Sequence, residues 1–146
     1  GTTYNVRAYA TNAVGTAYGS NKTFTTGLPN RVYVDAAGLC GGRAPCHNKV
    51  QNGVGAAGDG STVLVMQGSY PESVGMNTGH PLIMDFGFNS DYSSCVSNST
   101  IGDLTVSGGP VTIGGQLNIA GTTSSQGLAA SGRRCRNIKN WREQSA

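Results

Sequence analysis

The sequence of residues 31–74 is RVYVDAAGLCGGRAPCHNKVQNGVGAAGDGSTVLVMQGSYPESV, and this stretch decides the expected fold. Alternating apolar residues predict a strand over 31–35 and another over 61–66. Between them, a tight loop bounded by two cysteines is followed by a predicted helix over 45–57 and a glycine-containing turn. A strand, a short helix and a second strand in quick succession indicate a compact unit at one end of a larger β-structure.

The prediction of a helix is based on one apolar face. Val50, Val54 and Ala57 fall at i, i+4 and i+7, the spacing of neighbours on a helix surface. Pro45 suits the first helical turn, and Gly58 suits the C-terminal cap. The helix is expected to form only where this apolar face is buried.

Residues 58–72, GDGSTVLVMQGSYPE, resemble the opening coil of right-handed parallel β-helices of the pectate-lyase-like superfamily. The segment before them resembles the capping strand and helix that many bacterial surface β-helix proteins place there. Such a cap covers strand edges and core side chains that the open end of the coil would expose. Related proteins usually carry alanine where this chain has Gly53 and Gly55, and each interior glycine costs about 0.8–1 kcal/mol against alanine. The resemblance implies an all-β fold in which residues 31–121 form the cap and first coils.

Residues 99–121 repeat a pattern of short apolar strands and glycine turns. STIGDLTVSGG is followed by PVTIGGQLNIAG. In this repeat, which we call the apolar echo, Ile101 corresponds to Ile113. Leu104 and Val106 correspond in the same way to Leu117 and Ile119. Short strands separated by glycine turns are what successive faces of a coil need. The alternation stops after Gly121, so we expect 122–146 to be a disordered or non-native tail.

Residues 1–27 predict a hairpin. Tyr4, Val6, Ala8 and Ala10 alternate with Asn5, Arg7, Tyr9 and Thr11, and Asn12-Ala13-Val14-Gly15 is a turn signal. The segment resembles the last two strands of a fibronectin type III domain, with Tyr4 at the tyrosine corner. The resemblance implies an incomplete module over 1–27 and a linker over 28–30. A hairpin alone is marginally stable, so we expect it to pack on something or to fray.

The composition indicates a turn-rich β-protein with an uncharged polar surface. Charged residues make up only 12% of the chain, and 23 of its 146 residues are glycine. The net charge of +3 comes from the C-terminus, because residues 1–120 hold five Lys or Arg and six Asp or Glu. A basic terminus is more often solvated than bound to nucleic acid, so we expect no nucleic-acid partner.

The expected compartment is extracellular or the cell surface. No run is long and apolar enough to cross a membrane, and no signal peptide is present. The chain begins at Gly1 inside a predicted strand, so we expect a fragment of a larger protein. In that compartment, a disulfide between Cys40 and Cys46 is favoured over a metal site formed with His47, for which no fourth ligand is suitably spaced. The sequence leaves the bonding of Cys95 undecided: it is either paired with Cys135 or free.

The acids give no clear catalytic pair. Polysaccharide cleavage uses paired carboxylates, but the candidates are scattered and most fall in expected turns. They are Asp35, Asp59, Glu72, Asp85, Asp91 and Asp103. Families of this resemblance place their carboxylates, calcium ligands and arginine on later coils, so no catalytic, cofactor-binding or metal residue is transferred to this chain. We expect no cofactor.

Other residues with possible chemistry have simpler explanations. His80 is expected to be a solvated turn residue, and the glycosylation sequons at Asn21 and Asn98 are expected to be chance matches in a bacterial chain. The six tyrosines could form a strip for stacking on sugars, but their spacing is irregular and packing explains most of them.

The sequence therefore favours a non-catalytic structural or adhesive fragment of a large bacterial secreted or cell-surface protein that contacts polysaccharide or surface glycan. The alternative is the N-terminal part of a polysaccharide lyase or hydrolase whose active site lies downstream. A third hypothesis, a truncated gene with a foreign terminus, would account for the tail. The oligomeric state stays open.

Overall fold

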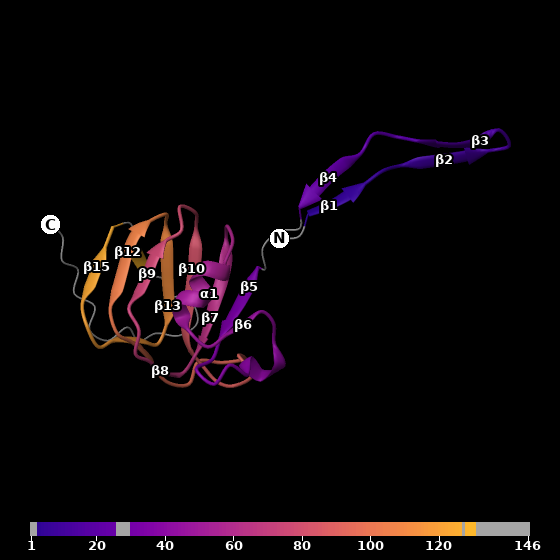
Figure 1. Ribbon diagram of the computed structural model, residues 1–146. Helices are drawn as coiled ribbons and strands as arrows, with labels where there is room; N and C mark the ends of the chain where they lie inside the picture. Colours follow the sequence, from indigo (N-terminus) through magenta and orange to yellow (C-terminus); the bar gives the residue numbers. More distant parts are fainter. Residues whose placement is uncertain (1–2, 26–29, 127, 131–146) are drawn as a thin grey trace.

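The computed structural model describes residues 3–25, 30–126 and 128–130. These residues form an all-β structure, as predicted, with α1 (Val50–Ala56) and a 3-10 turn over Cys40–Gly42 as its helical elements. None of the described helices is long and apolar enough to cross a membrane. The strands divide into an N-terminal hairpin and a body built from parallel sheets (Figure 1).

The N-terminal hairpin has the predicted turn. β1 (Thr3–Val6) pairs antiparallel with β4 (Lys22–Thr25), and β2 (Tyr9–Asn12) pairs with β3 (Gly15–Tyr18). The side chain of Asn12 closes the turn, because its Oδ1 accepts the N–H of Val14 at 2.8 Å and that of Gly15 at 3.1 Å. Every described residue of the hairpin is exposed, so the hairpin does not pack on the described residues of the body.

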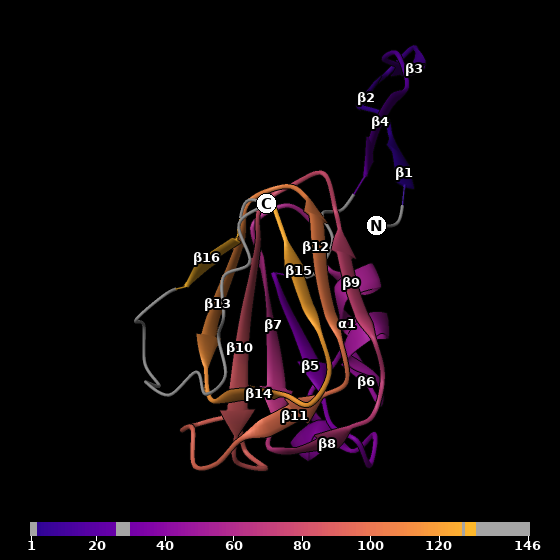
Figure 2. The same ribbon diagram turned by 90° about the vertical axis from the view of Figure 1, so that its left-hand side faces the viewer.

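The body contains three parallel sheets, which the chain visits in a fixed order (Figure 2). One circuit consists of a strand in each sheet, and three circuits follow one another before β16 returns to the first sheet. The first circuit is β7 (Ser61–Met66), β8 (Gly68–Tyr70) and β9 (Val74–Asn77). The second is β10 (Leu82–Phe88), β11 (Ser99–Ile101) and β12 (Leu104–Gly108). The third is β13 (Val111–Gly115), β14 (Leu117–Ile119) and β15 (Thr123–Ser125), and β16 spans Leu128–Ala130.

The core lies between the three sheets and is built by stacking equivalent residues. In the largest sheet, β5 (Arg31–Val34) precedes β7, and the register places Val32 beside Val63, Val63 beside Met84, and Met84 beside Ile113. All four side chains are at most 2% exposed. Burying one such side chain stabilises a fold by about 1.5–3 kcal/mol, so this repeated row is a main source of stability.

The helix is shorter than predicted at its N-terminal end. Cys46–His47 form β6, which pairs in parallel with β5. The N–H of Tyr33 donates to the carbonyl of Pro45, and the N–H of Asp35 donates to that of His47, each at 3.0 Å. Because this backbone is extended and bonded to the sheet, α1 begins only at Val50.

The C-terminal cap also differs from the prediction. Ala57, not Gly58, is the cap residue, and its N–H donates to the carbonyl of Val54 at 3.2 Å. The apolar face is as predicted, since Val50, Val54 and Ala57 are all buried against the core. The helix thus covers the core at the β5 end of the body.

The two glycines of α1 have different surroundings. A Cβ added at Gly53 would come within 2.6 Å of Cγ2 of Val34, so the helix approaches β5 too closely for a side chain at that position. A Cβ at Gly55 would meet nothing within 4 Å. Close packing against β5 therefore explains the glycine at position 53, whereas no packing contact explains the glycine at position 55.

The strand pairing continues past Gly121, where the alternation ends. β15 pairs with β12 and β16 pairs with β13, both in parallel. Thr123, Ser124 and Ser125 are polar, so the side chains carry no apolar signal while the backbone completes the ladder. Residues 131–146 lie outside the described residues.

The apolar echo relates different sheets rather than stacked positions. Ile101 in β11 pairs with Ile119 in β14, while Ile113 belongs to β13 in another sheet. Leu104 pairs with Thr123 and not with Leu117. The apolar echo thus relates strands on different faces of the circuits. Which residues stack on one another is shown only by the strand pairing in the structure.

Candidate functional site

Asp35 is a buried structural carboxylate at the end of β5. It is 3% exposed, and its two oxygens accept three backbone N–H groups. Oδ1 accepts the N–H of Ala37 at 2.9 Å, and Oδ2 accepts those of Leu39 and Cys40 at 3.2 and 3.0 Å. Its burial is compensated by these bonds, which hold the loop that leads to the 3-10 turn.

The Cys40–Cys46 disulfide predicted from the loop is present. The two Cα atoms are 5.8 Å apart, within the usual range for a disulfide. Both sulfurs are therefore unavailable to a metal, and the described residues contain no group of three or more His, Cys, Asp or Glu placed to hold one. Nε2 of His47 is buried and has no hydrogen-bond partner. Cys95 is also disulfide-bonded, so it is not free. Cys135 lies outside the described residues.

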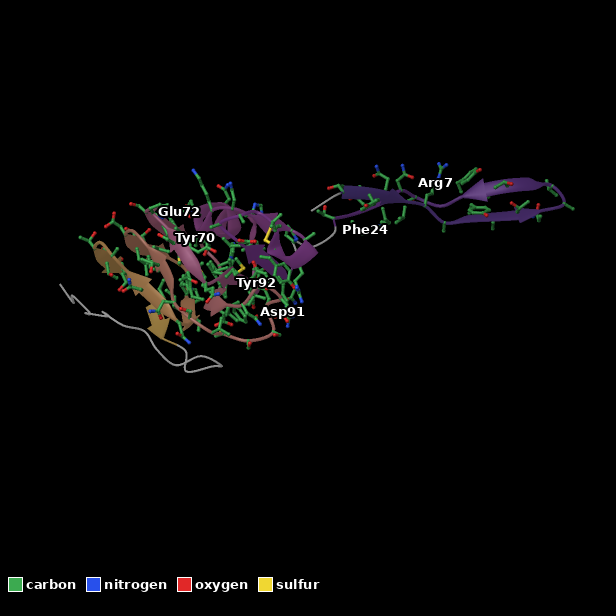
Figure 3. The ribbon with its side chains drawn as sticks, turned by 90° about the horizontal axis from the view of Figure 1, so that it is seen from below. Arg7, Phe24, Tyr70, Glu72, Asp91 and Tyr92 are labelled. Atoms are coloured by element: carbon green, nitrogen blue, oxygen red, sulfur yellow. A yellow bond between two sulfur atoms is a disulfide. The ribbon has the colours of Figure 1, made fainter. Side chains whose placement is uncertain are left out.

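Glu72 joins the first circuit to the helix. It lies between β8 and β9, and its Oε1 accepts the N–H of Val50 at 2.7 Å. Oε2 accepts the N–H of Gln51 at 3.4 Å. The carboxylate therefore satisfies donors at the first turn of α1, which have no partner within the helix. Figure 3 labels Glu72 beside the buried Tyr70.

Asp103 links three successive circuits at one corner. Its Oδ2 accepts the hydroxyl of Ser73 at 2.8 Å, and its Oδ1 accepts the N–H of Thr122 at 2.7 Å. The hydrogen bonds from Thr122 and then Ser73 lower the pKa of this carboxyl below its usual value. The register of β12 and β15 places Thr122 at the position of the next circuit that is equivalent to Asp103.

Asp91 lies in the loop after β10. The side chain and then the N–H of Ser93 lower the pKa of its carboxyl, and that N–H donates to Oδ1 at 2.9 Å. Both groups stabilise the ionised form. A carboxyl held ionised in this way is poorly suited to act as a general acid at neutral pH.

The other two acids belong to different places. Asp59 is exposed in the turn before β7. Asp85 lies half-buried within β10, with Leu64 and Gly114 as its strand neighbours. Each described acid is thus set in its own turn, loop or strand.

Three aromatic residues of the body, Tyr33, Phe88 and Tyr92, form a second cluster, separate from the main core. The ring of Tyr92 lies 5.0 Å from that of Tyr33 and 5.9 Å from that of Phe88. The guanidinium of Arg43 lies over the rings of Tyr33 and Tyr92, at 5.9 and 5.7 Å. The loop that carries Tyr92 and Asp91 is labelled in Figure 3. These contacts fix the loop to the sheet and leave the buried Tyr92 ring closed to ligands.

Two tyrosine phenols are used inside the body. Tyr92 donates to the carbonyl of Val34 at 2.8 Å, and Tyr70 donates to that of Met66 at 2.9 Å. Burial raises the pKa of Tyr70 to about 12 and also raises the pKa of Tyr92. Both phenols therefore stay protonated at neutral pH and act as hydrogen-bond donors.

The hairpin brings together Arg7, Tyr9 and Tyr18, a grouping that the sequence analysis did not predict. The guanidinium of Arg7 lies 4.1 Å from the ring centroid of Tyr18, and the rings of Tyr9 and Tyr18 are 6.1 Å apart. The signal was present in the alternation, which puts Arg7 and Tyr9 on one face. What was missing was the register that brings Tyr18 from the other strand.

The remaining candidates are turn or surface residues. Nδ1 of His80 lies 3.3 Å from the carbonyl of Pro81. Asn21 and Asn98 are both exposed. Nothing in their surroundings assigns them a chemical role.

Comparison with known proteins gives no relative. No family model matches the chain, and neither a curated protein nor a solved structure matches it. The functional argument therefore rests on the geometry described above.

Proposed function

We propose that the body forms the capped start of a right-handed parallel β-helix of the pectate-lyase-like kind. Support comes from three parallel sheets visited in a fixed order, with α1 over the core at one end. We propose in the same way that residues 1–27 are the last hairpin of a fibronectin type III module. Support there is the antiparallel register and the exposed apolar side chains that a sandwich would cover.

The proposed role is structural or adhesive, at the outside of a bacterial cell, with glycan contact and without glycan cleavage. The observation that carries it is the use of the carboxylates as structural acceptors. Asp35, Glu72 and Asp103 each accept hydrogen bonds that hold a loop, a helix end or a corner. Stacked circuits held in this way suit a rigid spacer.

Cleavage would need a different arrangement of acids. A glycosidase needs one carboxyl with a raised pKa beside a second carboxylate. A lyase needs a base and a cation directed at one sugar ring. Here the pKa values of Asp91 and Asp103 are lowered. Neither carboxyl has the protonation behaviour of a general acid.

The test combines binding with turnover. The purified chain is incubated with pectin and alginate, with and without calcium, while reducing ends and unsaturated products are followed. We expect retention on at least one polysaccharide and no product. Turnover that is lost in Asp85→Asn, Asp91→Asn or Asp103→Asn would overturn the structural role and favour the lyase or hydrolase alternative.

A further inference from the structure

The most exposed aromatic side chains of the described residues lie on the hairpin. Tyr9 is 71% exposed and Tyr18 is 60% exposed, whereas Tyr70 and Tyr92 of the body are 2% and 8% exposed. Tyr33 is half-buried beneath Arg43. A sugar stacks its apolar C–H face on an open aromatic ring, so the hairpin offers this contact better than the body does.

The hairpin has two different faces because successive side chains of a strand point to opposite sides. Tyr4 pairs with Phe24 and stacks on it at 5.4 Å, and Val6 follows on the same face. Arg7 and Phe24, labelled in Figure 3, come from the two different faces. In the proposed fibronectin type III module, further strands would cover the Tyr4 face and leave the opposite face open. In the structure, the residues of both faces are exposed.

The opposite face is the tyrosine–arginine face, formed by Arg7, Tyr9, Thr11, Thr16 and Tyr18. The register of β2 and β3 sets Tyr9 beside Tyr18 and Thr11 beside Thr16. The two rings are tilted by 41°, and the two hydroxyls are 2.8 Å apart. The face thus presents two rings, a guanidinium and a pair of hydroxyls in one continuous row.

The charge of the hairpin is entirely positive. Arg7 and Lys22 are its only charged side chains among residues 3–25, which contain no Asp or Glu. The body has the opposite balance, with Arg31, Arg43 and Lys49 against six acids in residues 30–126. A guanidinium that stacks on a ring and has no carboxylate in its own hairpin is suited to a ligand carboxylate or sulfate, which it can bind through two N–H groups.

We infer that the tyrosine–arginine face of the hairpin binds an acidic glycan. This inference rests on the proposed glycan contact and assigns it to one surface and one ligand class. Tyr9 and Tyr18 stack on sugar rings, and Arg7 pairs with the acidic group. The row of residues along the strands suits an extended polymer better than a single sugar.

Affinity electrophoresis of the whole chain tests the inference, with polygalacturonate and alginate as acidic probes and dextran as a neutral one. We expect retardation by the acidic polymers only. The double variant Tyr9→Ala/Tyr18→Ala should weaken binding about tenfold or more, since two stacking contacts are lost. Tyr9→Phe/Tyr18→Phe keeps both rings and the hairpin, and it should bind within about twofold of the wild type.

A charge-matched pair separates recognition from general attraction. Arg7→Gln and Lys22→Gln each remove one positive charge, but Lys22 pairs with Val6 on the opposite face. We expect a much larger loss in Arg7→Gln. Equal losses in the two variants, or equal retardation by dextran, would overturn the inference.

Two further outcomes distinguish this inference from the proposed function. Glycan binding that no hairpin variant changes would place the contact outside the hairpin, which overturns the inference and leaves the adhesive role. Binding to no glycan at all would remove the proposed glycan contact together with the inference. The turnover assay still decides separately between scaffold and enzyme.

Discussion

The carboxylate of Glu72 accepts the backbone N–H of Val50 at 2.7 Å and so joins the first turn of α1 to the corner between β8 and β9. A second polar contact from the helix to this part of the circuit is made by Gln51. Its side-chain amide accepts the N–H of Gly75 at 2.7 Å and donates to the carbonyl of Gly75 at 3.1 Å. Gly75 lies in β9, an edge strand of its sheet, so the amide occupies backbone groups that a further strand would otherwise bind. The cap is therefore held by polar bonds as well as by its apolar face.

Removing the Glu72 carboxylate should destabilise the body. We expect Glu72→Ala to lower the free energy of unfolding by about 1–2 kcal/mol, because the first helical N–H groups lose their acceptor. Glu72→Gln keeps one oxygen acceptor and should cost less. Urea denaturation measures both, with Asp59→Ala as the exposed control, expected within about 0.5 kcal/mol of the wild type. A Glu72→Ala variant as stable as that control would contradict the capping role.

The two glycines of α1 should respond oppositely to alanine. Gly55→Ala should stabilise the protein by up to about 0.8–1 kcal/mol, because the site is open and alanine favours a helix. Gly53→Ala should be destabilising, because overpacking costs about 1–3 kcal/mol and the new methyl meets Val34. Thermal and urea denaturation of the two variants under the same conditions provide the measurement. Stabilisation by both substitutions would show that α1 does not lie so close to β5.

The Asp103 corner should make stability depend on pH in the acid range. Its lowered pKa means that its contribution is fully present above the unfolded value, about 3.9, and is lost as the pH falls through the folded value. Asp103→Asn should therefore be less stable than the wild type at pH 7 and approach it at pH 2–3. The check is the urea midpoint of both proteins between pH 2 and 7. If the urea midpoints of the two proteins change in parallel over this range, the ionised Asp103 carboxylate does not stabilise the corner.

The cysteines should be protected in the oxidised protein. Cys40 and Cys46 are bonded to each other, and Cys95 is disulfide-bonded as well. We expect none of the three to react with iodoacetamide in denaturant until a reductant is added. Mass spectrometry of the digested, labelled protein reads each site separately. Labelling of Cys95 before reduction would show that Cys95 is a free thiol, which is the alternative that the sequence left open.

The sequence by itself determined the local features of this protein. Alternation predicted the hairpin strands, β5 and the first strand of the first circuit, β7, and Asn12 at the turn could be recognised from its chemistry. The short Gly- and Pro-containing loop predicted the Cys40–Cys46 disulfide, and the i, i+4, i+7 spacing predicted the buried face of α1. In each case the physical cause acts within a few residues of the chain.

Tertiary structure decided the features that depend on distant partners. The helix starts at Val50 because β5 binds the backbone of the preceding residues, and Glu72 becomes a helix cap because a circuit of the chain returns it to Val50. Stacking is set by backbone bonds between strands separated by loops of unequal length, so Ile101 meets Ile119 rather than Ile113. The same bonds admit the polar strand β15, since backbone N–H and carbonyl groups pair whatever side chain they carry. On the hairpin, alternation alone set Arg7 and Tyr9 on one face, but only the pairing of β2 with β3 brought Tyr18 beside them.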